Sequence, residues 1–329
     1  MTRTTLFLVA CTFAAGCGSS HDMTDHMNQV TQGPHECETP EDAAAPADQT
    51  IEARYATVKP DGVNAMNVIT FGGTVPGPVL TLDVGQTRRY KLTNRTDVPI
   101  GLHFLGLSYD VKDDGTPLYP KSIVYPGCSH VYTMTAKTPG IFPFVDHLNP
   151  MKTMAAGQYG AVVVRAPGEP AVDKEYVYLL GELGQEHEGG HEEEEEEEEG
   201  GGARTFFMTM NGRTEEAPLA IERNANGFVS REGFSDSRVG NTVRFRLLNV
   251  SPSTYHSFGM HGYNFCDRGG TVDASGGCPN QGRPVNIVSL SPLEGMTVEL
   301  RTDNPGLWMI HCHVLDHVAE GMMSYFDVK

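Results

Sequence analysis

The 329-residue sequence carries 24 Lys and Arg against 42 Asp and Glu, which gives a formal net charge of −18 at pH 7. An acidic chain without a basic patch lacks the cations that neutralise phosphate, so we expect no nucleic-acid partner. The 37 Gly and 21 Pro favour many short strands and turns over a helical bundle, and the length suits two domains of ordinary size.

Residues 1–17 have the pattern of an export signal. Arg3 precedes a short apolar run, and small residues lead directly to Cys17. The run is too short for a permanent membrane span. Small residues before a Cys are typical of a bacterial lipid-attachment site, and the alternative is plain secretion with cleavage nearby. We therefore expect an exported protein, periplasmic or at the cell surface, that meets a membrane only through a lipid anchor on Cys17.

Residues 18–50 are polar and rich in Ala, Pro, Asp and Thr, which predicts a disordered tether. Residues 51–168 alternate apolar and polar side chains in short segments, separated by turn sequences such as Pro60-Asp61-Gly62. Residues 175–329 repeat this organisation after a short linker. The pattern predicts two all-β domains, each a sandwich or barrel.

An acidic segment, residues 182–202, interrupts the second domain between two predicted strands. Residues 182–199 alone hold eleven Glu and no Lys or Arg, and removing those charges from −18 would leave −7. Like charges at this density repel one another, so we expect a solvated acidic loop. The alternative is an arm that gathers metal ions, with His187 and His191, or that steers a partner through its field.

The segment from His311 to Met322 gathers the donor atoms of a copper site. Cys312 is followed by His317 five residues later and by Met322 five residues further on. Two His, one Cys and a weak axial Met are the ligands of a type 1 (blue) copper, which transfers single electrons. We expect a strand that ends at Cys312 and a tight loop that returns to the metal, with His256 as the second His. A structural zinc site or chance histidines are the alternative.

Strand geometry divides the neighbouring histidines into two groups. Successive side chains on a strand face opposite ways, so Cys312 points into its own domain while His311 and His313 point out of it. His256 and His261 are five residues apart, an odd spacing that places His256 inside with Cys312 and His261 outside. The sequence thus predicts a second metal site that is joined to the first by one short piece of backbone.

The run His311-Cys312-His313, followed by His317 and Met322, resembles the C-terminal signature of the multicopper oxidase family, which includes laccases and has copper nitrite reductases as relatives. The resemblance covers about residues 50–329. It is to the two-domain bacterial branch, whose type 1 copper lies in the second domain and whose chains form trimers. It implies two cupredoxin-like domains and a homotrimer.

Laccase activity is the less supported function. The trinuclear copper cluster of laccases takes eight His from four His-x-His-type motifs, and only the motif around Cys312 is whole here. Other ligand positions hold residues that cannot bind copper: Leu105, Pro143, Val145 and Gly259. By resemblance, four cluster ligands remain: His103, His261, His311 and His313. Three coppers and the reduction of oxygen to water are therefore not expected.

Copper nitrite reductases resemble the remaining residues more closely. They hold one type 2 copper with three His across a subunit interface. The resemblance implies that His261 and His311 supply two ligands and that His147 supplies the third from a neighbouring chain, with His103 as a further candidate.

Proton delivery would need residues other than those of the nitrite reductases. The catalytic Asp of that family falls at Gly259 here, and its catalytic His falls near Ile100. The candidates for a substitute general acid are His103, His313 and Asp146.

The seven cysteines are consistent with an oxidising compartment. Cys11 and Cys17 lie in the leader, and Cys312 is expected to bind copper. Cys266 and Cys278 bracket a Gly-rich loop and are predicted to pair. Cys37 and Cys128 then pair by elimination.

Two functions follow from these residues. The first is a copper oxidoreductase in which type 1 copper passes electrons to a mononuclear type 2-like copper, and a small nitrogen or oxygen species is reduced there. The second is a non-enzymatic blue-copper electron carrier or copper-handling lipoprotein. The expected partners are a small redox donor protein, either a cytochrome or a cupredoxin, and a small-molecule substrate.

Overall fold

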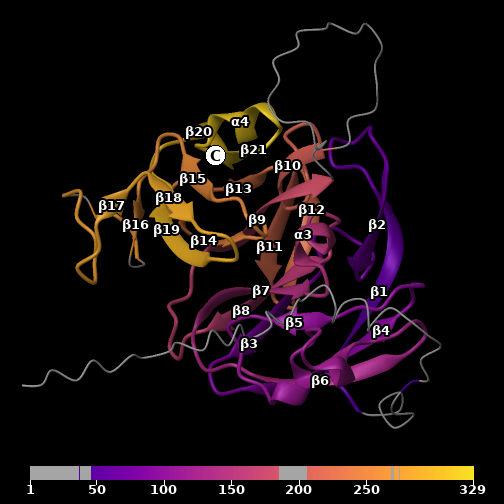
Figure 1. Cartoon of the computed structure of the whole chain (residues 1–329). Coiled ribbons are helices and arrows are strands. Elements are labelled where there is room, and N and C mark those ends of the chain that lie inside the picture. The colour runs from indigo at the N-terminus through magenta and orange to yellow at the C-terminus, as the bar shows by residue number, and fades with distance from the viewer. Residues whose placement is uncertain (1–36, 38–45, 185–205, 268–269, 274) are drawn as a thin grey trace, which may run out of the picture.

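The computed structural model describes residues 37, 46–184, 206–267, 270–273 and 275–329. The predicted signal, most of the tether and most of the acidic segment lie outside the described residues. Figure 1 shows the strands in two lobes, with β3–β8 below and β9–β21 above, while β2 rises beside the upper lobe. Each lobe is built of curled, stacked sheets, which confirms the predicted all-β fold of two cupredoxin-like domains.

The first domain contains two four-stranded sheets, with strand orders β2-β1-β4-β6 and β3-β8-β7-β5. Its elements are β1 (Gln49–Val58), β2 (Met66–Phe71), β3 (Val79–Asp83), β4 (Thr87–Asn94), β5 (Leu102–Phe104), η1 (Val111–Asp113), η2 (Pro120–Ser122), β6 (Ser129–Thr135), β7 (Gly140–Asp146), α3 (Pro150–Thr153) and β8 (Tyr159–Arg165). Alternate residues such as Leu80 and Leu82 on β3 are fully buried between the sheets, as the period-two pattern predicts.

The second domain contains two larger sheets and a short hairpin. One sheet has the order β12-β11-β9-β14-β19 with β10 also on β9, the other has the order β13-β21-β20-β15-β18, and β16 pairs with β17. The elements are β9 (Lys174–Gly184), β10 (Phe206–Met210), β11 (Leu219–Asn224), β12 (Gly227–Glu232), β13 (Ser235–Ser237), β14 (Thr242–Asn249), β15 (His256–Met260), β16 (Phe265–Cys266), β17 (Pro284–Val285), β18 (Ile287–Leu290), β19 (Gly295–Arg301), β20 (Gly306–Cys312), α4 (Leu315–Ala319) and β21 (Met323–Val328).

Strand β9 joins the two domains because both of its faces are buried. Tyr176 and Tyr178 belong to the core of the second domain. Val177 and Leu179 point the other way, into a hydrophobic cluster that also contains Val163 of β8. A strand buried on both faces reads as a continuous apolar run, as this one does. The domains therefore share one hydrophobic layer.

A cluster of buried charges lies at the linker between the domains. Nε of Arg246 lies 2.5 Å from a carboxylate oxygen of Glu175, and Nη1 of Arg223 lies 2.9 Å from the other. Glu169 of the linker also binds Arg246, at 2.7 Å. Burial raises the pKa of Glu175, but the charges of Arg246, Arg223 and Arg244 outweigh it, so the pKa is lowered. The carboxylate is held ionised between the guanidinium groups.

Both predicted disulfides are present, Cys37–Cys128 and Cys266–Cys278, and Cys312 is free and buried. Within the described part of the chain, no helix has the length and hydropathy to span a membrane.

Candidate metal centre

Three buried donors converge between β15, β20 and α4. Sγ of Cys312 lies 3.6 Å from Nδ1 of His317 and 4.0 Å from Nδ1 of His256. The two Nδ1 atoms are 3.2 Å apart. Among the described residues, this is the one group of three or more His, Cys, Asp or Glu whose donor atoms all lie within 4.8 Å of one another. The structure therefore brings together the three strongest of the four predicted type 1 ligands.

The fourth predicted ligand, Met322, adjoins this group. Its side chain is fully buried in the same hydrophobic cluster as Cys312. Its carbonyl accepts the amide hydrogen of Cys312 at 3.2 Å, and its own amide donates to the carbonyl of His317 at 2.9 Å. The segment after Cys312 thus folds back on itself, as expected. It does so through the short helix α4, which carries His317, where a loop was predicted.

Burial shifts the pKa values of two of the three donor groups, Cys312 and His256. Burial raises the pKa of the Cys312 thiol, although the amides of Ser257 and Val314 oppose the shift. Burial and the neighbouring His317 lower the pKa of His256 to about 3, so its imidazole is neutral. Two buried imidazoles and a thiol that face one another fit the ligand set of a type 1 copper, in which the thiol binds as thiolate.

Two further contacts hold these ligands. Oγ of Ser251 lies 2.8 Å from Nε2 of His256, on the ring nitrogen that does not face Cys312. The amide of Ser257 donates to Sγ of Cys312 at 3.3 Å. Sequence reasoning missed Ser251, which follows the end of β14 in a Ser- and Pro-containing turn that has no feature of a site.

The histidines beside Cys312 face away from this pocket, as the strand alternation predicts. Nε2 of His311 lies 3.0 Å from Nε2 of His261, and Nδ1 of His311 donates to the carbonyl of Cys312 at 2.8 Å. The ring of His313 lies against that of His311, with centroids 4.1 Å apart. Burial, His311 and His261 lower the pKa of His313. Two imidazole nitrogens that face each other at 3.0 Å need a proton or a metal ion between them.

His103 and His147 form a separate pair in the first domain. Their ring centroids are 4.9 Å apart, and Nδ1 of His103 donates to the carbonyl of Asp114 at 2.7 Å. Nδ1 of His147 is buried and has no hydrogen-bond partner among the residues that the structure describes, and burial and His103 lower the pKa of His147. In the described part of this chain, no group of three close donors joins His103 or His147 to His261 or His311.

Asp146 lies behind this pair. One of its carboxylate oxygens accepts the amides of Gly101 and Leu148, both at 3.1 Å. Burial raises its pKa to about 7, although these two amides oppose the shift. These contacts place the carboxylate against backbone, where it holds the loop that carries His147.

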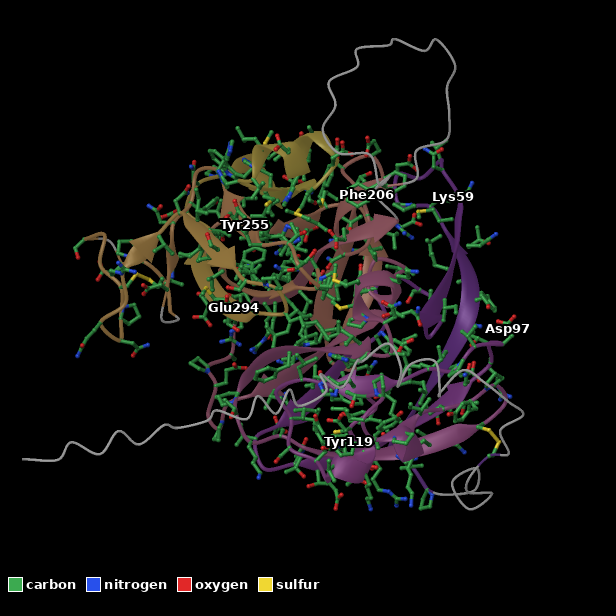
Figure 2. All side chains as sticks on the ribbon, viewed as in Figure 1. Lys59, Asp97, Tyr119, Phe206, Tyr255 and Glu294 are labelled. Carbon is green, nitrogen blue, oxygen red and sulfur yellow. A yellow bond between two sulfur atoms is a disulfide. The ribbon has the colours of Figure 1, made fainter. Side chains whose placement is uncertain are left out.

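Two exposed apolar side chains lie close in sequence to ligands of the type 1 pocket. Tyr255, labelled in Figure 2 on the upper lobe, precedes His256 and is 58% exposed. Leu315, two residues before His317, is 72% exposed. The segments that carry His256 and His317 therefore each present an apolar side chain that solvent or a partner can contact.

Fold and donor set together define a two-domain cupredoxin-like copper protein. Residues 52–169 and 204–329 match two family models that are both described as multicopper oxidase. The chain belongs to the multicopper oxidase family.

The curated relatives are distant and much longer. A probable nitrite reductase-hydroxylamine oxidoreductase fusion protein of Kuenenia stuttgartiensis is 26% identical over 78% of this chain and 28% of that protein. Ferroxidase HEPHL1 of Mus musculus is 25% identical over 77% of this chain and 23% of that protein. The chain thus spans about a quarter of the length of these relatives.

Solved structures support the fold over most of the chain. A multicopper oxidase superposes with a TM-score of 0.67 at 23% identity, over 85% of this chain and 88% of that one. A copper nitrite reductase from Nitrosomonas europaea gives 0.65 at 20% identity, over 85% and 93%.

Proposed function

We propose that this chain is a copper oxidoreductase with a type 1 copper at His256, Cys312, His317 and Met322, and with a mononuclear type 2-like copper at His261 and His311. When bound, these coppers would supply one-electron transfer and the reduction of a small nitrogen or oxygen species such as nitrite.

One observation carries this proposal. Sγ of Cys312 faces His256 and His317, whereas the preceding residue, His311, faces His261 with the two Nε2 atoms 3.0 Å apart. One peptide unit therefore connects both donor groups. The hydrogen bond from Nδ1 of His311 to the carbonyl of Cys312 fixes the ring and leaves Nε2 as the donor to a metal.

The donor group at His261 and His311 needs a further ligand. Because His103 and His147 form their own pair in this chain, we infer that His147, with His103 beside it, completes the site in a neighbouring chain of a homotrimer. Burial of Nδ1 within its own chain leaves Nε2 of His147 as the nitrogen for a metal held by a neighbouring chain. Proton delivery would fall to His103, His313 or Asp146.

Exposed Tyr255 and Leu315 favour a small redox protein, either a cytochrome or a cupredoxin, as the electron donor, because apolar surface near a type 1 site allows close approach of another redox centre. We also propose that the protein is exported, for which the two disulfides are the support. We propose in addition that Cys17 carries a lipid anchor and that the two domains span residues 51–168 and 175–329.

The alternative is an electron carrier that has lost the second metal. Positions 105, 143, 145 and 259 hold Leu, Pro, Val and Gly, which cannot bind copper, and the second donor group is incomplete within the described chain. The same substitutions argue against a laccase.

Copper stoichiometry and electron paramagnetic resonance spectra of the wild type, Cys312→Ser and His261→Ala distinguish the two functions. We expect two coppers per chain in the wild type, loss of only the blue signal in Cys312→Ser, and loss of only the type 2 signal in His261→Ala. The wild type should reduce nitrite or oxygen with an artificial donor. One copper per chain and no turnover would establish the carrier.

A further inference from the structure

The chain that precedes the first domain is attached beside the edge strand β6. Cys37 forms a disulfide with Cys128, which directly precedes β6. The carbonyl of Cys128 accepts the amide of Asn94 at 3.0 Å, so the disulfide lies at the end of β4. The chain then enters the domain along the same strand, because the amide of Asp48 donates to the carbonyl of Arg89 at 2.9 Å. Both attachments are therefore on the β4–β6 pair.

The residues around these attachments are basic. Residues 87–95 and 118–137, which contain β4, η2 and β6 and are called the basic edge below, hold six Lys and Arg and no Asp or Glu. Two of the six form exposed ion pairs, Arg88 with Asp48 at 3.5 Å and Arg95 with Glu52 at 3.6 Å. A chain whose net charge is −18 thus has a local basic surface that its overall charge conceals.

Exposed apolar side chains accompany the cations. Leu118 and Tyr119, directly before η2, are 56% and 40% exposed, and Figure 2 labels Tyr119 at the lower end of the lower lobe. Lys121 and Lys137 are exposed and form no ion pair among the residues that the structure describes. Lysines beside Leu and Tyr fit an anionic lipid surface, because the headgroups attract the lysines while the apolar side chains enter the interface.

A lipid on Cys17 would hold this edge close to a membrane. Residues 18–36 separate Cys17 from Cys37, and a chain of that length spans at most about 70 Å when fully extended. Figure 1 shows β6 at the bottom of the lower lobe and α4, which carries His317, at the top of the upper lobe. A molecule that rests on β6 therefore turns the type 1 pocket away from the lipid.

We propose that the basic edge docks on the anionic surface of the membrane that holds the lipid anchor, and that it orients the type 1 pocket toward soluble electron donors. The orientation rests on the proposed lipid at Cys17. Lipid binding by the basic edge is a property of the edge itself, and it is tested without the anchor and without copper.

Lipid binding is measured by sedimentation of residues 18–329, secreted without the lipid, with vesicles of phosphatidylglycerol and phosphatidylethanolamine. The double variant Lys121→Gln and Lys137→Gln should bind about tenfold or more weakly than the wild type. Vesicles of phosphatidylcholine should bind the wild type about as weakly. The matched control, Arg238→Gln and Lys329→Gln, removes the same charge from exposed positions of the second domain and should bind like the wild type.

Equal binding by the two double variants would overturn the docking surface, because overall charge would then account for the attraction. Equal binding of the wild type to anionic and phosphatidylcholine vesicles would overturn it as well. Sedimentation velocity without vesicles tests the other occupant. Dissociation of an oligomer in Lys121→Gln and Lys137→Gln, but not in the control, would make the basic edge an interface between copies of this chain.

The orientation is measured on the lipidated full chain in vesicles of the same phospholipids with brominated acyl chains, which quench tryptophan. Trp308, the one tryptophan of the sequence, lies on β20 of the second domain, and its emission should not change. Tyr119→Trp should add an emission of which the brominated lipids remove most. Quenching of Trp308, or none in Tyr119→Trp, would overturn the orientation.

The possible failures can be told apart. A full chain that stays in the soluble fraction would refute the lipid on Cys17 and the orientation together, and the vesicle sedimentation would still decide whether the basic edge binds lipid. Copper stoichiometry decides the proposed function separately, since neither vesicle experiment depends on bound copper.

Discussion

Oγ of Ser251 lies 2.8 Å from Nε2 of His256, while Nδ1 of the same ring faces Cys312. Ser251 is itself fixed, because its amide donates to the side chain of Asn249 at 2.8 Å. Asn249 in turn donates to the carbonyls of Thr254 and Leu290. The turn after β14 thus orients the first ligand of the type 1 pocket before any metal binds.

Replacing Ser251 with Ala should weaken copper binding at the type 1 site by about 10–100-fold, because the ring of His256 loses the partner that orients it. Competition with a copper(I) chelator measures this affinity. Ser289→Ala is the matched control, since its hydroxyl lies 3.1 Å from Oγ of Ser257 on the same sheet and does not contact His256. Equal affinities in Ser251→Ala and the wild type would show that packing alone orients the ring.

Copper uptake should depend on pH through Cys312. Because burial raises the pKa of its thiol, the metal-free protein keeps the proton at neutral pH and releases it when the thiolate binds. The apparent affinity should therefore rise about tenfold per pH unit between about pH 6 and 8. His256, whose pKa is about 3, is already neutral and adds nothing in this range. The same chelator competition checks the slope, and Cys312→Ser should abolish it. An affinity that does not change with pH would contradict the prediction.

The charge of Glu175 should stabilise the fold at neutral pH. Its pKa is lowered from the ordinary glutamate value of 4.5, so its contribution is fully present above about pH 4.5 and is lost as the pH falls through the folded-state value. Glu175→Gln leaves the guanidinium of Arg246, 1% exposed, without its closest carboxylate. We expect a loss of about 3–5 kcal/mol in the free energy of unfolding at pH 7.

Urea unfolding between about pH 7 and 3 measures this effect, and the variant should show a flatter pH dependence than the wild type. The control is Glu52→Gln, which removes an exposed pair with Arg95 at 3.6 Å and should change the free energy of unfolding by less than about 1 kcal/mol. Equal losses in the two variants would mean that burial of the pair is unimportant.

Gly295 should be intolerant of any side chain. It follows Glu294, labelled in Figure 2 where the upper lobe approaches the lower one. A Cβ here would lie 2.1 Å from the carbonyl oxygen of Ile141 in the first domain. Backbone on both sides cannot yield, so Gly295→Ala should destabilise the protein by about 1–3 kcal/mol and speed proteolytic cleavage between the domains. An unchanged Tm and cleavage rate would show that the domains adjust to the methyl group.

The sequence was sufficient where the alternation of side chains along a strand determines which way each one points. The alternation along β20 placed Cys312 opposite His311, and the odd spacing from His256 to His261 gave the same division on β15. The sequence was insufficient where contacts between separate loops determine the structure. Nothing in the sequence around Ser251 indicates that its turn returns to His256. Likewise, the presence of Gly259 does not indicate that the ring of His313 packs against it. Those contacts depend on how separate segments pack.

Strand β9 has a further consequence for the histidines of the two domains. One hydrophobic layer, which contains Val163 of the first domain and Leu179 of the second, packs the two domains together. Large apolar contacts of this kind suppress hinge motion between domains. The pair at His103 and the pair at His261 are thereby kept at a set separation within every molecule. Under the proposed function, a centre that unites them forms only between molecules, so we expect dilution to abolish reductase activity before it removes the blue colour.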